Sequence, residues 1–249
     1  MENARRTALI TGSGQMIGRG IALRLAEAGF NIILNGSKNK DACEAVAKEL
    51  TAFGVDTLIA MGNVGVKEDT SQIIKAGIDK FGSIDVLVNN AAIRPHTAFL
   101  DVTDTEWDEV HNINLKGPLW MIKACLPGMM ERKWGRIINF TGMMAQQGYQ
   151  GAAAVASSKH ANWGLIKSLS DEFGKYGITA NIISPGTFPG DDFDVETDER
   201  RKKLRDENPL RRLGRTTEIG GLIAYLCSED GAFMNGQMLQ INGGVVVQF

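Results

Sequence analysis

Short runs of apolar residues alternate along the chain with longer stretches whose apolar residues recur at the spacing of one helical face. The short runs predict buried strands, and the longer stretches predict amphipathic helices. The expected strands are residues 7–10, 31–34, 57–60, 86–88, 136–140, 179–183 and 238–241. The expected helices are residues 18–28, 105–133, 155–176 and 218–226, with one more around residues 42–53 and another that ends near residue 81.

Regular alternation of strands and helices favours a parallel sheet that is covered on both faces. We therefore expect an α/β fold, a Rossmann-type doubly wound parallel β-sheet, with its ligand beyond the carboxyl ends of the strands. The length of 249 residues suits a single domain, residues 1–249. Residues 186–208 break the alternation and are rich in Asp, Glu and Arg. We expect a substrate lid over residues 187–208, with a solvated surface loop as the alternative.

Composition narrows the class of protein further. Hydrophobic residues make up 43% and charged residues 22%, the usual balance for a soluble protein with a large core. The formal charge of -2, with both signs mixed along the chain, argues against nucleic acid as a partner. No apolar run is long enough to span a bilayer, and no signal peptide is apparent. The three cysteines lie far apart and, with three histidines, show no disulfide or metal-ligand spacing, so we expect a cytoplasmic protein without a metal site.

A glycine-rich turn follows the first predicted strand and reads Thr11-Gly12-Ser13-Gly14-Gln15-Met16-Ile17-Gly18. Glycines let a backbone turn tightly and approach a pyrophosphate, which amides at the next helix N-terminus can then bind. The turn misses the G-x-G-x-x-G pattern by one residue. Its position directly after strand one of an α/β chain nevertheless indicates a nucleotide-binding site.

This turn resembles that of the short-chain dehydrogenase/reductase family, which reads T-G-x-x-x-G-x-G. Thr11, Gly12 and Gly18 match, whereas Met16 stands where the family has its middle glycine. Further family landmarks follow in order over essentially the whole chain: Asn89-Asn90-Ala91-Ala92, Asn114, Lys159, Pro185-Gly186 and Asn242-Gly243-Gly244. The resemblance is of the 3-oxoacyl-carrier-protein reductase type.

The resemblance implies a site for a nicotinamide dinucleotide. Its implied residues are Gly12, Ser13, Gln15, Met16, Ile17 and Gly18 at the pyrophosphate, Asn63 and Val64 at the adenine, Asn90, Ala91, Ala92 and Lys159 at the ribose, and Pro185, Gly186 and Thr187 at the nicotinamide. The family usually has Asp where Asn63 stands. Met16 needs room where the family has a hydrogen atom, and a flexible thioether can fold aside. The alternative is a Rossmann shell that no longer holds a cofactor.

The residues after the second predicted strand bear on which dinucleotide is bound. An acidic residue there would accept hydrogen bonds from the ribose 2′-hydroxyl and select NAD. This chain has Asn35-Gly36-Ser37-Lys38 instead, with no carboxylate and a nearby ammonium. We therefore expect NAD(P) binding at Ser37 and Lys38 with NADP favoured over NAD, unless Lys38 simply projects into water.

Two family groups that move protons are missing. The family has a tyrosine four residues before the helix lysine, on the same helix face, and a serine thirteen residues before that tyrosine. Counting back from Lys159 gives Val155 and then Gly142. Loss of a general acid costs about 10²–10⁴ in rate, so ordinary ketone reduction should be severely impaired. The cleft should also be roomier and more apolar.

Tyr149 and His96 are the candidate replacements for the missing acid. Tyr149 lies in the loop before the Lys159 helix, and His96 follows the Asn-Asn-Ala-Ala segment. The alternatives are a rim aromatic and a loop histidine without a role. We expect no catalytic part for three other groups: Thr141 should point away, His160 is turned about 100° from Lys159 around the helix, and His111 should be packed. The resemblance implies that Asn114 organises a proton-relay water, and Lys159 could itself act as acid or base if burial lowers its pKa.

Three functions remain open on the sequence. The first is an NAD(P)-dependent oxidoreductase that acts on a small apolar carbonyl or alcohol compound through an atypical site. The second is a hydrolase, lyase or isomerase of a carbonyl compound on the same fold. The third is a catalytically silent binding or assembly partner. Besides a small-molecule substrate, we expect a homodimer or homotetramer, because the family pairs the helices at residues 105–133 and 155–176 across a two-fold axis.

Overall fold

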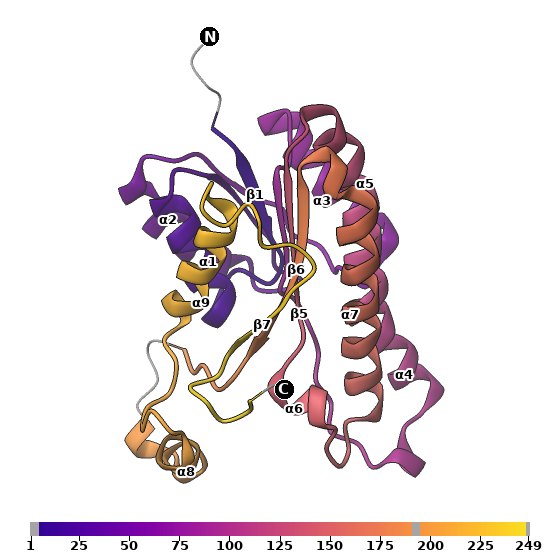
Figure 1. The fold of residues 1–249 in the computed structure, drawn as a ribbon, viewed down its shortest axis with the longest axis vertical. Coiled ribbons are helices and arrows are strands. Elements are labelled where there is room, and N and C mark those ends of the chain that lie inside the picture. Colours follow the sequence, from indigo (N-terminus) through magenta and orange to yellow (C-terminus); the bar gives the residue numbers. More distant parts are fainter. Residues whose placement is uncertain (1–4, 191–194, 248–249) are drawn as a thin grey trace.

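Parallel strands run through the middle of the molecule, with helices on both sides (Figure 1). The computed structural model describes residues 5–190 and 195–247, and in this part the sheet has the order β3-β2-β1-β4-β5-β6-β7. The strands are β1 (Thr7–Ile10), β2 (Asn31–Leu34), β3 (Thr57–Ile59), β4 (Val86–Asn89), β5 (Gly135–Phe140), β6 (Ile178–Pro185) and β7 (Met238–Ile241). All of their pairings are parallel. The expected Rossmann-type doubly wound sheet is confirmed.

The two helical layers bury opposite faces of this sheet. One layer holds α1 (Met16–Glu27), α2 (Lys40–Leu50) and α9 (Thr216–Cys227), and the other holds α3 (Lys67–Phe81), α5 (Gly117–Arg132) and α7 (Ala153–Phe173) (Figure 1). A hydrophobic core lies on each face of the sheet, and β1 contributes to both. Ala8 and Ile10 pack on the α1 side, and Leu9 packs on the α3 side. Because both faces are covered, the strands read as continuous apolar runs.

The expected single helix over residues 105–133 is wrong in one respect. It is divided into α4 (Asp104–His111), a π-helical turn (Asn112–Lys116) and α5. A Cβ atom at Gly117 would lie 2.5 Å from the Val64 carbonyl oxygen, so the chain passes another backbone closely at this point. The π-helical turn adds one residue to the helical repeat, and Asn114 lies within it on the interior side, where the residue is 2% exposed.

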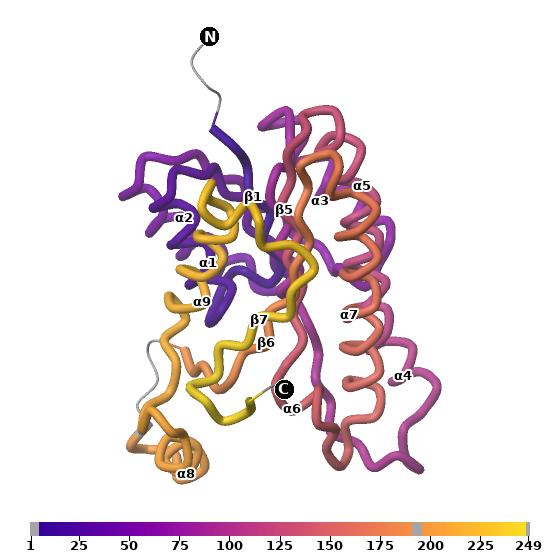
Figure 2. The backbone as a smooth tube through the Cα atoms, viewed as in Figure 1, coloured from indigo at the N-terminus to yellow at the C-terminus, as the bar shows by residue number. Residues whose placement is uncertain are grey.

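Residues 186–208 are also more regular than expected. They contain a 3-10 turn (Val195–Thr197) and the helix α8 (Glu199–Glu207), whose N-terminal amide at Arg201 is capped by the Asp198 side chain. α8 lies beyond the carboxyl end of the sheet, apart from both layers (Figure 2). The helix was missed because it has no apolar face; ion pairs such as Lys202–Glu199 line it instead. Residues 191–194 of the predicted lid lie outside the described residues.

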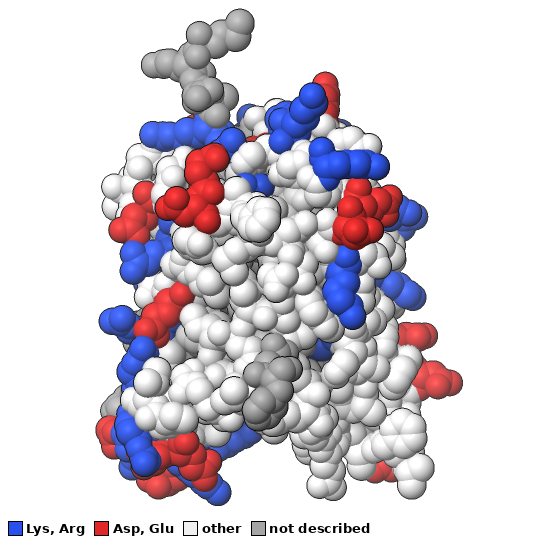
Figure 3. Space-filling model, in the orientation of Figure 1, with Lys and Arg blue, Asp and Glu red and all other residues white. Residues whose placement is uncertain are grey.

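The surface in view carries both signs of charge side by side around its rim, and its middle is largely uncharged (Figure 3). Over the described part of the chain, no helix combines the length and the apolar character needed to cross a membrane.

A further short helix, α6 (Met143–Gln147), follows β5 and was not predicted.

Helices α1 and α9 cross at two glycines. A Cβ atom at Gly20 would lie 2.5 Å from the backbone of Thr216, and one at Gly220 would lie 2.4 Å from the Gly20 carbonyl oxygen. At the neighbouring Gly221, by contrast, a Cβ atom would meet no described atom within 4 Å.

We predict opposite effects for two adjacent substitutions in α9. Gly220→Ala should lower the free energy of unfolding by about 1–3 kcal/mol, because the methyl group would push two backbones apart. Gly221→Ala should raise it by up to about 1 kcal/mol, because alanine is the better helix former. Urea denaturation of both variants checks this, and equal effects at the two positions would contradict the close crossing.

Candidate active site

The turn after β1 has the close packing that a pyrophosphate needs. Gly12 adopts a left-handed φ of 63°, and a Cβ atom at Gly18 would lie 2.2 Å from the Gly12 carbonyl oxygen. Only glycine fits both positions. Helix α1 begins at Met16, so its unpaired N-terminal amides belong to the same turn. A cradle of this shape beside free helix amides fits a dinucleotide phosphate.

Met16 keeps the backbone conformation that a glycine would adopt. Its φ is 48°, a left-handed geometry that costs other residues about 1–2 kcal/mol. The side chain is 40% exposed, and its Cγ atom lies 3.8 Å from where Gly190 would carry a Cβ atom. The thioether therefore lies between the turn and the segment that follows β6.

Asn35 holds the turn against the end of β3. It is 1% exposed, its Oδ1 atom accepts from the Gly12 amide (3.4 Å), and its Nδ2 atom donates to the carbonyls of Ala60 (2.9 Å) and Gly62 (3.1 Å). Asn35 was noted in the sequence as a non-acidic residue, but its role in fixing the turn was missed. Ser37 and Lys38 follow it and are exposed.

The predicted adenine residues lie next along this edge. The Asn63 side chain accepts from the Gly65 amide (2.9 Å) and Val64 is buried, so both shape the loop after β3. The predicted ribose segment is tied to the glycine turn, because Asn90 donates to the Thr11 carbonyl (2.9 Å) and the Ala91 amide donates to the Thr11 hydroxyl (3.0 Å).

The predicted nicotinamide residues Pro185, Gly186 and Thr187 stand at the carboxyl end of β6. The Gly186 amide donates to the Ile241 carbonyl (2.9 Å), and the Thr187 carbonyl accepts from the Gly214 amide (3.0 Å). These bonds hold the segment against the end of β7 and the chain before α9.

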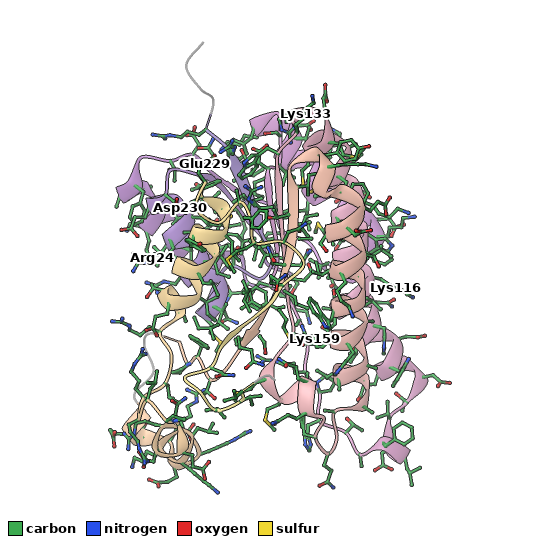
Figure 4. All side chains as sticks on the ribbon, viewed as in Figure 1. Arg24, Lys116, Lys133, Lys159, Glu229 and Asp230 are labelled. Carbon is green, nitrogen blue, oxygen red and sulfur yellow. The ribbon has the colours of Figure 1, made fainter. Side chains whose placement is uncertain are left out.

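Lys159 extends from α7 to the end of β5 (Figure 4), where its ammonium donates to the Phe140 carbonyl (2.9 Å). The residue is 6% exposed. Burial, and secondly the positive charge of Arg94, lower the pKa of Lys159 to about 8. Arg94, in the loop after β4, was missed in the sequence because nothing in its spacing connects it to Lys159.

The two positions that the sequence predicts for the family's tyrosine and serine have different surroundings. Val155 is 2% exposed and packs with Val110, Ala154 and Ile93 in a small apolar cluster. Gly142 has extended backbone (φ -173°), and a Cβ atom there would meet no described atom within 4 Å. Position 155 is therefore closely packed, whereas position 142 has open space beside it.

The two candidate acids, His96 and Tyr149, are neighbours. Their rings stack with centroids 6.2 Å apart, and the Thr97 amide donates to the Gly151 carbonyl (3.0 Å) beside them. The loop after β4 and the loop before α7 are thus joined at this pair. His96 is exposed and Tyr149 is half-buried.

The Asn114 side chain hydrogen-bonds to the backbone of the loop that leads to His96. Its Oδ1 atom accepts from the Ile93 amide (3.0 Å), and its Nδ2 atom donates to the Ile93 carbonyl (3.0 Å) and to the Ser158 hydroxyl (3.3 Å). Asn114 and Lys159 are therefore connected through consecutive residues of α7.

Three further polar residues were expected to have no catalytic part. His160 is exposed and its ring contacts the Ala156 carbonyl (3.0 Å). His111 is half-buried, stacked on Trp107 at 4.5 Å. Thr141 is buried. Within residues 5–190 and 195–247, no cluster of His, Cys, Asp or Glu could hold a metal ion.

Comparisons with known proteins identify the family of the chain. Residues 12–246 match the family model described as enoyl-(acyl carrier protein) reductase. The chain is 36% identical over 240 residues to the 3-oxoacyl-[acyl-carrier-protein] reductase FabG of Staphylococcus epidermidis, covering 96% of this chain and 98% of that one. The chain belongs to the short-chain dehydrogenase/reductase family.

Other members of the short-chain dehydrogenase/reductase family agree in sequence and shape. The 3-oxoacyl-[acyl-carrier-protein] reductase of Synechocystis is 32% identical over 97% of both chains. The crystal structure of acetoin dehydrogenase YohF from Salmonella typhimurium superposes with a TM-score of 0.88 at 31% identity, covering 97% of this chain and 96% of that one. The family is one of oxidoreductases.

We predict a pH signature for the buried ammonium. Because the folded-state pKa of Lys159 is about 8 against an ordinary 10.5, the unfolded chain binds more protons between these values. The charged ammonium destabilises the fold below about pH 8, and this cost disappears as the pH rises through that window. The free energy of unfolding of the wild type should therefore rise relative to Lys159→Met by up to about 1.4 kcal/mol per pH unit there.

Chemical denaturation at several pH values measures this difference. Lys48→Met, at an exposed position of α2, is the matched control and should run parallel to the wild type. If the free energies of unfolding of the wild type and Lys159→Met differed by the same amount at every pH, the ammonium would not be desolvated in the folded protein.

Proposed function

We propose that the protein is an NAD(P)-dependent oxidoreductase that acts on a small, apolar carbonyl or alcohol compound through an atypical active site. The observation that carries the proposal is the glycine cradle of Gly12 and Gly18, joined through Thr11 and Ala91 to the loop after β4. A nicotinamide ring, when bound, supplies or accepts hydride. The residues of the chain bind it, orient it and move the proton.

Each retained group has a role in this proposal. Lys159 binds ribose hydroxyls with an ammonium held by the Phe140 carbonyl. Asn114 fixes the loop after β4. Tyr149 or His96 replaces the missing acid; their stacking supports this role, because it holds both polar rings at the junction of two loops that border the cleft. An apolar substrate is proposed because the sequence has an aliphatic residue, Val155, and a residue without a side chain, Gly142, where the family has two polar groups.

A second function, a hydrolase, lyase or isomerase of a carbonyl compound, is favoured by one observation. An amine whose pKa is about 8 is available as base or acid near neutrality without a phenol beside it. We also propose a cytoplasmic location and a homodimer or homotetramer; the placement of α5 and α7 together in one outer layer supports the pairing that the family uses (Figure 1).

We expect fluorescence titration to show tighter binding of NADPH than of NADH. Lys38 is exposed directly after β2, where a 2′-phosphate would lie. Lys38→Met should weaken NADPH binding about tenfold, or about 1.4 kcal/mol, and leave NADH unchanged, whereas Lys48→Met should change neither. Absence of binding to either dinucleotide would overturn the proposal.

A panel of carbonyl compounds then separates the two functions in the same preparation. Consumption of NADPH supports the oxidoreductase. Conversion of a compound without net change in the dinucleotide supports the second function.

Restoring both vacated groups should create ordinary reductase activity. Gly142→Ser places a hydroxyl on unstrained backbone in open space. Val155→Tyr supplies the phenol, with its ring turned out of the Val110 cluster. We predict that the double variant reduces simple ketones about 10²-fold faster than the wild type.

The control is Gly142→Ser with Val155→Phe, which has the same ring but no hydroxyl and should show no gain. No gain from Val155→Tyr with Gly142→Ser, in a folded protein that binds NADPH, would contradict the assignment of these two positions.

A further inference from the structure

A chain of buried amide side chains runs beside Lys159. Asn89 donates from Nδ2 to Oδ1 of Asn139 (2.8 Å), and Asn139 donates from Nδ2 to Oδ1 of Asn162 (2.8 Å). Asn162 in turn donates to the carbonyls of Asn114 (2.6 Å) and Ser158 (3.0 Å). Each of the four asparagines is at most 5% exposed. The amides therefore form one continuous network in the interior.

The two ends of this hydrogen-bond network lie on the same segment of the chain. Asn114 holds both backbone groups of Ile93, and Ile93 is four residues after Asn89. The residues between them are the proposed ribose segment, Asn90 to Ala92. One set of hydrogen bonds therefore holds this segment at both of its ends.

Asn162 is the link between the strand part of this network and its loop part. It lies three residues after Lys159 and seven after Val155, on the helix face that is buried against the sheet. Such a position normally carries an apolar residue. A buried amide is costly unless it is hydrogen-bonded, and here its oxygen and its nitrogen are both used.

We propose that Asn162 is a positioning residue that fixes Lys159 and residues 89–93 relative to one another, so that the ribose side of the site is pre-organised before a ligand binds. The ligand part of this inference rests on the proposed dinucleotide binding. The structural part does not, since the hydrogen bonds form in the protein alone. Replacement of Asn162 should remove the hydrogen bond to the Asn114 carbonyl and make the π-helical turn more mobile. The hydrogen bonds from the Asn114 side chain to Ile93 should then weaken.

The experiment compares two buried asparagines. Asn162→Leu removes the link, and Asn181→Leu is the matched control. Asn181 is 0% exposed in β6 and also makes a donor bond (Met234 carbonyl, 2.7 Å) and an acceptor bond (Gln237 amide, 2.9 Å), but to the loop before β7. Both variants leave buried groups unpaired, so both should lower Tm by a few degrees, about 2–6 °C.

Only Asn162→Leu should change the site. We expect hydrogen exchange of the Ile93 amide, measured without ligand, to be about tenfold faster than in the wild type, and the Kd for NADPH to rise about tenfold. Asn181→Leu should leave both values unchanged. Asn162→Ser, a smaller polar residue that cannot reach both Asn139 and Asn114, should change both values in the same direction and replaces Asn162→Leu if that variant does not fold.

The outcomes separate the two proposals. Unchanged exchange at Ile93 in the Asn162 variants, or equal effects from Asn181→Leu, would overturn the positioning role. Faster exchange at Ile93 in a protein whose wild type binds neither NADPH nor NADH would support the positioning role and overturn the proposed function.

Discussion

A parallel sheet that is buried on both faces leaves one edge at which polar chemistry can be placed. Here β1, β4, β5 and β6 are adjacent and parallel, so the glycine turn, residues 90–92, the carbonyl that accepts from Lys159 and the segment after Pro185 all follow carboxyl ends on the same side of the sheet. The two cores on either side are closed by apolar side chains, and the loops at the edge depend on the sheet for their relative positions.

The sequence predicted this framework because each part has a local signal. The apolar runs located the strands. Gly12, Asn90, Lys159 and Pro185 occur along the chain in the same order as the neighbouring strands β1, β4, β5 and β6 occur across the sheet. The assignment of Val155 and Gly142 to the tyrosine and serine positions of the family rests on counting back from Lys159 and stays a prediction. The structure then showed that the surroundings of Val155 and Gly142 differ, which no spacing could reveal, because packing depends on residues distant in sequence such as Val110.

Other features had no sequence signal that periodicity could detect. α8 is stabilised by ion pairs rather than by an apolar face, so a search for apolar spacing passes over it. The π-turn at Asn114 depends on the close approach of Gly117 to Val64. Asn162 carried a faint signal, a polar residue on the buried face of a helix, but its meaning required three partners from different elements. The effect of the Arg94 charge on the pKa of Lys159 likewise depends on the tertiary structure.

The unequal surroundings of Gly142 and Val155 bear on which substitutions this fold accepts. A serine at position 142 would displace nothing, because the backbone there is already extended and the space is free. A tyrosine at position 155 would have to turn its ring away from a closed cluster of apolar neighbours. A lineage of such proteins therefore has a lower barrier to a hydroxyl at the first position than to a phenol at the second.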